Sequence, residues 1–134
     1  MLLAVVDTNV WVSAHLAPDG TPAKLLNAFA DGLFVPVYTP EIEIEYRAVL
    51  YRPKFAIGRE ELDLFMALLA ETGRLIDPLR LDAPSLPDPD DAPFIAAART
   101  AACPIVTGNT RHFPPESGAE VISPAVCLAR LFTR

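Results

Sequence analysis

The amino-acid sequence predicts an α/β fold, a three-layer α/β/α domain with a short central parallel sheet. Short apolar runs of strand length alternate along the chain with longer helical patterns, and turn or capping residues separate them. Strands that alternate with helices imply parallel pairing through helical crossovers. The chain has 134 residues, of which 51% are hydrophobic. We therefore expect a single domain spanning residues 1–134, with enough apolar content for its own core.

The first predicted strand, residues 2–6, is an apolar run, and we expect a helix over residues 10–16 to follow it. Pro18-Asp19-Gly20 has the composition of a turn and ends that helix. Thr21-Pro22 predicts a second helix, because a hydroxyl can cap its start and proline has no N–H to leave unsatisfied. This helix is expected to end at residues 31–32, where glycine follows Asp.

The second predicted strand covers residues 33–38, and Pro36 within it indicates an edge strand or a bulge. Thr39-Pro40 repeats the capping pattern. It begins a helix that we expect to continue to about Tyr51, because Arg52-Pro53 then interrupts the pattern.

Residues 59–72 predict an amphipathic helix, since apolar side chains recur three and four positions apart, and Gly73 ends it. Leu75-Ile76 is a candidate for a minor strand. Residues 77–93 contain five prolines and five Asp residues and are expected to form a loop.

The last part of the chain predicts a further strand–helix alternation. Small residues from Phe94 to Ala102 favour a helix, and residues 105–107 and 121–122 favour short buried strands. Ser123-Pro124 is expected to cap a final helix that ends at Phe132.

The composition excludes several classes of protein. The net charge of −6 and pI of about 4.8 are unlike those of a strongly basic nucleic-acid binder. They do not exclude a nucleic-acid enzyme, because carboxylates that hold a cation count as negative until it binds. Cys103 and Cys127 lie in apolar surroundings and are expected to be buried free thiols. The sequence has neither the pattern of a signal peptide nor an apolar run of membrane-spanning length, so we expect a cytoplasmic protein.

Polar side chains occur near the carboxyl end of each main predicted strand. Asp7 ends the first strand, Glu45 lies in the helix after the second, Asp91 precedes the helix at 94–102, and Asn109 follows the strand at 105–107. In a parallel sheet these places share one edge. Three carboxylates cannot remain ionised together without a cation between them, and oxygen ligands suit Mg²⁺ or Mn²⁺. The pattern therefore predicts metal-assisted hydrolysis of a phosphodiester.

Each of these positions also has a structural interpretation. Asp7 and the Asp-rich residues 88–91 both precede helices and could simply cap them. Glu45 shares its helix with two other Glu residues, which is typical of a solvated face. Asn109 follows Thr-Gly and is common in turns. The order of the positions against the strands is what favours a joint site.

Four segments together resemble a known family. They are Asp7-Thr8-Asn9-Val10, Thr39-Pro40 with Glu45-Tyr46, the stretch from Asp88 to Ala98, and the stretch from Thr107 to Phe113. In this order, and over nearly the whole chain, they resemble the PIN-domain family, in particular the VapC-like ribonuclease toxins of toxin–antitoxin modules. The resemblance implies a divalent-metal-dependent endoribonuclease whose partners are an RNA substrate and a cognate antitoxin protein.

The resemblance also implies roles for individual residues. Asp7, Glu45 and Asp91 correspond to the catalytic acids that bind Mg²⁺ or Mn²⁺, and Asn109 to a fourth ligand. The family often has Asp at this fourth position, so here the site would have one negative charge fewer. Asp88 is the candidate for supporting a metal ligand without binding the ion.

Other polar residues near these segments have smaller roles. Thr8 and Thr107 are candidates for hydrogen bonds to the acidic ligands. Arg111 and His112 are candidates for contact with RNA phosphate, although loop-surface and packing roles are common for such residues.

Two other functions are compatible with parts of the sequence. A non-catalytic or weakly catalytic PIN-fold module that binds RNA or protein would tolerate Asn109. A phosphatase with an aspartyl nucleophile at Asp7 typically has a second Asp two residues later, where this chain has Asn9. The six glycines never form a glycine-rich loop, which argues against a Rossmann-type cofactor site.

We also expect a homodimer. The chain is rich in apolar residues, and its large aromatic side chains lie on short elements, so some apolar surface is expected to remain after folding: Trp11, Phe29, Phe34 and Phe65. The family resemblance points to the same association.

Overall fold

The computed structural model describes residues 1–78, 89–114 and 117–132. Within them a five-stranded sheet has the order β3-β2-β1-β4-β5, and every strand pair is parallel. The central strand β1 (Leu2–Val6) lies between β2 (Phe34–Tyr38) and β4 (Ile105–Val106), and the short strands β3 (Arg74–Leu75) and β5 (Val121–Ile122) form the edges. The predicted α/β fold class is therefore confirmed.

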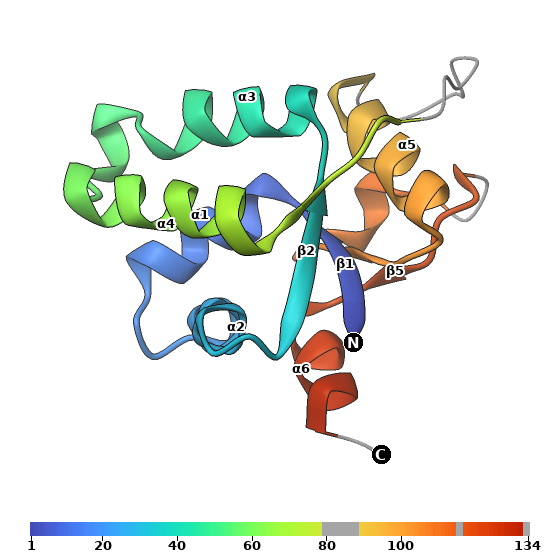
Figure 1. Cartoon of the computed structure of the whole chain (residues 1–134), viewed down its shortest axis with the longest axis horizontal. Helices are drawn as coiled ribbons and strands as arrows, with labels where there is room; N and C mark the ends of the chain where they lie inside the picture. Colours follow the sequence, from blue (N-terminus) through green and yellow to red (C-terminus); the bar gives the residue numbers. More distant parts are fainter. Residues whose placement is uncertain (79–88, 115–116, 133–134) are drawn as a thin grey trace.

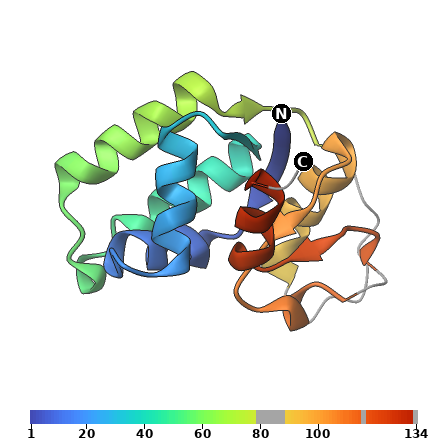
Figure 2. The same ribbon diagram turned by 90° about the horizontal axis from the view of Figure 1, so that it is seen from below.

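Helices cover both faces of this sheet. One group lies to one side of β1 and β2 in Figure 1: α1 (Thr8–Leu16), α2 (Thr21–Ala30), α3 (Pro40–Leu50) and α4 (Arg59–Thr72). On the other side lies α5 (Ala92–Ala101), which packs on β1 and β2. The last helix, α6 (Pro124–Phe132), packs beside α2, as Figure 2 also shows.

The strand register brings the ends of β1 and β4 level with each other. Val6 pairs with Val106, so the next residues, Asp7 and Thr107, leave the sheet side by side. The backbone N–H of Asp7 donates a hydrogen bond to the Val106 carbonyl at 2.8 Å. Topology and register therefore place two predicted site residues at the same carboxyl edge of the sheet.

The core is built around an aromatic cluster on the α1–α4 side. Trp11 and Phe65 meet edge to face with ring centroids 5.0 Å apart, and Phe29 and Phe34 complete the cluster. All four rings are at most 4% exposed. They are buried within the single chain, so they do not account for a dimer, and the homodimer remains a prediction that rests on the family resemblance.

Several boundaries differ from the expected ones. The first helix begins at Thr8, and α5 begins at Ala92, because Pro93 fits the first helical turn without losing a hydrogen bond. Thr39 caps α3 as expected, accepting from the N–H of Ile42 at 3.3 Å. The expectation that Thr21 caps α2 is wrong, because Gly20 occupies the N-cap position and Thr21 is already the first helical residue. Residues 79–88 of the expected loop lie outside the described residues.

Pro36 does not mark an edge strand, because β2 lies between β1 and β3. Its pairing with β3 starts at Val37, and the Tyr38 carbonyl accepts from Ile76 on that side. In a strand, the backbone polar groups of residues i and i+2 face the same neighbouring strand. The backbone nitrogen of Pro36 therefore faces the β3 side, as the Tyr38 carbonyl does, but β3 has not yet begun at that position. The proline thus removes no hydrogen bond from the ladder.

Cys103 and Cys127 are buried free thiols, as expected, and burial raises the pKa of each to about 11. In the part of the chain that the structure describes, no helix combines the length and the apolar character needed to cross a membrane.

Gly73, the residue after α4, lies where a side chain would collide with the backbone. A Cβ there would be 2.6 Å from the Leu69 carbonyl oxygen and 3.1 Å from the ring of Tyr38. We expect Gly73→Ala to lower the free energy of unfolding by about 1–3 kcal/mol, as overpacking typically does. Urea denaturation measures this. Gly58→Ala is the control, since its Cβ would be 4.0 Å from the nearest side-chain atom, and equal losses of stability in the two variants would contradict the steric account.

Candidate metal centre

Asp7 is a buried carboxylate at the carboxyl end of the central strand. It is 8% exposed, and its Oδ2 accepts a hydrogen bond from the Thr107 hydroxyl at 2.8 Å. Asp7 occupies the N-cap position of α1, but its side chain makes no capping hydrogen bond. The simple helix-cap interpretation therefore does not account for its carboxylate, which faces β4 instead.

Burial raises the pKa of Asp7, because the ionised form loses its water. The Thr107 hydroxyl opposes this rise most strongly. The backbone N–H groups of Thr8 and Asn9, which lie near the carboxylate without forming a capping hydrogen bond, and a protonated His112 oppose it more weakly. The donors around Asp7 thus only partly compensate for its burial. A cation beside the carboxylate would favour the ionised form further.

Glu45 lies on the same side of the molecule as Asp7. The Thr8 hydroxyl donates a hydrogen bond to its Oε2, which joins the second turn of α3 to the start of α1. The Glu45 side chain is half-buried. Its neighbour Glu43 instead forms an exposed 3.3 Å ion pair with Arg47. The solvated-face interpretation fits Glu43, whereas Glu45 is directed toward the end of β1.

Asp91 occupies the N-cap position of α5 without a side-chain capping hydrogen bond, and it is 8% exposed. Its Oδ2 lies 3.7 Å from the Nδ1 of His112. A protonated His112 would also lower the pKa of Asp7. The imidazole of His112 thus faces Asp91, whereas the side chain of its neighbour Arg111 is exposed.

Asn109 is exposed and forms the turn that leads into the short 3-10 helix Thr110–His112. Its Oδ1 accepts from the N–H of Arg111 at 3.3 Å, and its own N–H donates to the Thr107 hydroxyl at 3.1 Å. The turn interpretation thus accounts for the contacts of Asn109. The Thr107 hydroxyl nevertheless links Asn109 to Asp7, because it accepts from the Asn109 N–H and donates to the Asp7 carboxylate. Asp88 lies outside the described residues.

The structure therefore connects the candidate acids through their neighbours. Among the described residues, no group of three or more His, Cys, Asp and Glu side chains forms a ready-made metal site. Mutual repulsion of ionised carboxylates opposes such a group unless a cation is present. Carboxylate oxygens are nevertheless the donors that Mg²⁺ and Mn²⁺ prefer. One of these carboxylates, Asp7, is buried, and its burial raises the cost of ionising it without a cation. The donor set fits a divalent cation in its chemistry.

Sequence reasoning missed the contribution of Tyr46. This side chain is fully buried, and its hydroxyl donates to the carbonyl of Val6, the residue before Asp7. The signal was available, because Ile42, Tyr46 and Leu50 recur every four residues and form the buried face of α3.

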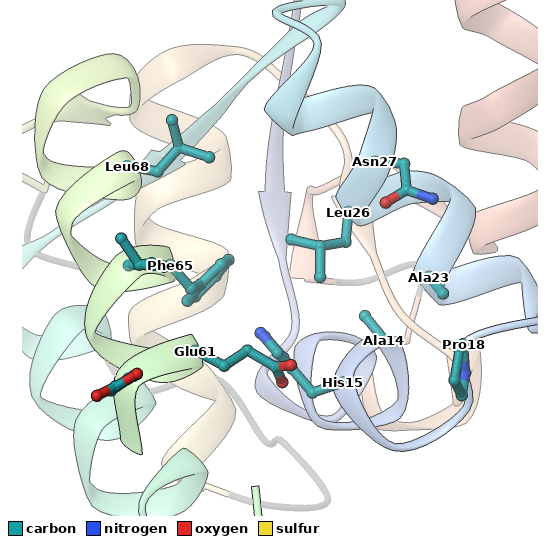
Figure 3. Close-up of a pocket in the computed structure, with 11 residues that line it drawn as sticks. Ala14, His15, Pro18, Ala23, Leu26, Asn27, Glu61, Phe65 and Leu68 are labelled. Atoms are coloured by element: carbon teal, nitrogen blue, oxygen red, sulfur yellow. The ribbon is translucent and has the colours of Figure 1, made fainter. Parts of the chain in front are cut away.

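A separate groove lies away from the carboxylates, between α4 on one side and α1 and α2 on the other (Figure 3). It has a volume of about 700 Å³. Leu26, Phe65 and Leu68 line its apolar walls, and Glu60 and Glu61 add acidic groups from α4. The groove is therefore apolar inside and acidic along one side.

Comparisons with known proteins identify relatives of this chain. A family model described as PIN domain matches residues 4–111. The chain is 29% identical over 108 residues to the uncharacterized protein MJ1680 of Methanocaldococcus jannaschii, covering 78% of this chain and 69% of that protein.

Two solved structures have a similar fold. The structure of FitAB bound to an IR36 DNA fragment matches with a TM-score of 0.59 and 18% identity, covering 92% of this chain and 95% of the matched one. The crystal structure of FitAcB from Neisseria gonorrhoeae matches with a TM-score of 0.55 and 17% identity, covering 93% and 99%. At this level of identity, the two structures show a shared fold.

Proposed function

Since the chain belongs to the PIN-domain family, we propose that it is a divalent-metal-dependent endoribonuclease that hydrolyses RNA phosphodiester bonds. PIN domains are generally nucleases and generally use divalent metals. The observation that carries the proposal is the buried carboxylate of Asp7, which leaves the central strand beside Thr107 and next to the Thr8–Glu45 pair.

In this proposal, Asp7, Glu45 and Asp91 hold Mg²⁺ or Mn²⁺. A divalent cation bound there supplies positive charge to the phosphoryl oxygens and a binding place for the attacking water. Asn109 is the fourth candidate ligand. Its amide can contribute an oxygen but no charge, and in the structure that oxygen accepts from a backbone N–H.

The surrounding donors orient the acids. The Thr107 hydroxyl donates to Asp7 and the Thr8 hydroxyl donates to Glu45, so each of these carboxylates has one oxygen held in place. Partners of this kind fix the orientation of metal ligands. His112 places a titratable imidazole beside Asp91, where it can also approach RNA phosphate.

The experiment that tests this function is RNA cleavage by the purified protein, on structured and unstructured RNA, with Mn²⁺ and with a chelator. We expect cleavage inside RNA strands with Mn²⁺ and none with chelator. RNA binding without cleavage at any Mn²⁺ concentration would instead support the non-catalytic binding module.

Asn109→Asp tests the fourth position. If Asn109 faces the ion, the added charge should raise the affinity for Mn²⁺, because close charges interact by a few kcal/mol even at an effective dielectric of ~20. Without metal, the same change should destabilise the fold by adding a carboxylate near Asp7. Calorimetric titration and melting in chelator measure the two effects. Unchanged affinity and unchanged melting would leave Asn109 as a turn residue, because Asp also caps turns well.

We further propose that the protein is the toxin of a toxin–antitoxin pair, and that its groove binds the antitoxin. The apolar walls formed by Leu26 and Leu68, with acidic groups at Glu60 and Glu61, suit an apolar segment that carries Lys or Arg.

Leu68→Glu should therefore weaken binding of the cognate antitoxin by about tenfold or more, because a charge would be buried against apolar residues. Isothermal titration with the purified antitoxin protein measures the affinity. Leu75→Glu, on an edge strand outside the groove, is the control. Equal affinities of the parent and Leu68→Glu would exclude the groove as the binding surface.

A further inference from the structure

Tyr46 lies where the three elements that carry Asp7, Thr8 and Glu45 meet. Its side chain is fully buried, and its hydroxyl donates to the Val6 carbonyl at the end of β1. The contact spans 40 residues of sequence and joins α3 to the strand that ends in Asp7. A buried tyrosine hydroxyl needs a hydrogen-bond partner, and here that partner belongs to the strand that carries Asp7.

Helix α1 lies close to this residue. The indole of Trp11, a fully buried residue of α1, lowers the pKa of Tyr46. Helices α1 and α3 pack against each other beside the end of β1 (Figure 1). The Tyr46 hydroxyl therefore joins α3 to β1 at a place where α1 packs against α3.

Adjacent residues of an α-helix point about 100° apart around its axis. When Tyr46 is fixed toward β1, the rotation of α3 is fixed, and this rotation determines where the neighbouring Glu45 points. In the structure Glu45 points to the Thr8 hydroxyl, one residue after Asp7. We propose that Tyr46 is a positioning residue that sets Glu45 against Asp7 through its hydrogen bond to the Val6 carbonyl. This inference rests on the proposed metal-dependent function.

The surroundings of Tyr46 favour its neutral hydroxyl, which is the form that donates this hydrogen bond. Burial raises the pKa of Tyr46 far above its ordinary range, the Trp11 indole partly opposes the rise, and the nearby charges of Asp7 and Glu45 add to it. A neutral Tyr46 hydroxyl can donate to the Val6 carbonyl. The contribution to the site that we propose for Tyr46 is therefore geometric.

Tyr46→Phe tests the proposal, because it keeps the ring and removes only the hydroxyl. We expect calorimetric Mn²⁺ affinity to fall about tenfold, as is typical when a group that orients a metal ligand is lost. Tyr51→Phe is the matched control. It removes a hydroxyl at the other end of α3, where Tyr51 bonds to the exposed Asp63, and should leave Mn²⁺ affinity unchanged.

A double-mutant cycle separates positioning from general loosening of the fold. If Tyr46 acts through Glu45, Tyr46→Phe should change Mn²⁺ affinity by less than about twofold once Glu45→Gln is present, because coupled residues are not additive. An equal loss in both backgrounds, or no loss in either, would overturn the proposal.

Hydrogen exchange of the metal-free protein provides a readout that needs no ion. In Tyr46→Phe the amides of residues 43–46 should exchange faster than in Tyr51→Phe, because the first half of α3 would be less firmly held on β1. Equal exchange rates would contradict the positioning role. If the parent binds no Mn²⁺, the metal-dependent function fails, and exchange still decides whether Tyr46 fixes α3.

Discussion

Replacing Asp7 with Asn should lower the rate of RNA cleavage by on the order of a hundredfold or more, because the proposed metal centre would lose the negative charge that the central strand holds. The substitution keeps the shape of the side chain and its acceptance of the Thr107 hydrogen bond. Single-turnover cleavage assays at saturating Mn²⁺ measure the effect. Asp19→Asn, in the exposed turn after α1, removes the same charge far from the site and should cleave RNA like the parent.

The same variant should behave differently in stability measurements without metal. Because burial raises the pKa of Asp7, its protonated form is favoured by folding. The parent should therefore lose stability as the pH rises from the ordinary Asp range through the raised pKa of Asp7. Asp7→Asn should remove this loss, so in chelator it should melt at or above the parent at neutral pH. A variant that cleaves RNA as well as the parent, or melts lower, would contradict the assigned role.

Thr107→Val should lower RNA cleavage and Mn²⁺ affinity by about 10–100-fold, which is typical when a partner that orients a metal ligand is lost. Thr107 is fully buried, and its hydroxyl both donates to Asp7 and accepts from the N–H of Asn109. Valine has nearly the same shape but leaves both groups without this partner. Kinetic assays over a range of Mn²⁺ concentrations separate weaker metal binding from slower chemistry.

Thr107→Ser keeps the hydroxyl and should stay close to the parent in both measurements. Thr100→Val is a second comparison, since its hydroxyl bonds to the Ala96 carbonyl within α5 and lies away from the carboxylates. If Thr107→Val and Thr100→Val had the same small effect, the Thr107 hydroxyl would have no special role at Asp7.

Local sequence patterns predicted those helix starts that depend on a single capping residue. Thr39-Pro40 predicted a capped helix, and the Thr39 hydroxyl accepts the expected hydrogen bond. Thr21-Pro22 carries the same signal, but there Gly20 takes the cap position, because cap identity depends on backbone angles that the two residues do not fix. The alternation of strands and helices was sufficient for the parallel sheet, since few other connections are possible.

The site was only partly predictable for a different reason. Asp7 could be placed from β1 alone, because a strand delivers its last residue to a defined edge. The direction of Glu45 depends on the rotation of α3, which the buried Tyr46 sets through a contact with Val6. The approach of His112 to Asp91 joins residues 21 positions apart across the end of β4. Contacts of this kind arise from tertiary packing, which local patterns do not specify.

Anomalous diffraction from crystals grown with Mn²⁺ would locate a bound ion directly at the proposed centre. We expect one strong peak at the carboxyl edge of the sheet, within coordination distance of the Asp7 carboxylate, with Glu45 and Asp91 as its other protein ligands. The peak should disappear in Asp7→Asn at the same Mn²⁺ concentration. A fully occupied ion bound elsewhere, or a peak of equal height at this edge in Asp7→Asn, would contradict the assignment of Asp7 as the principal ligand.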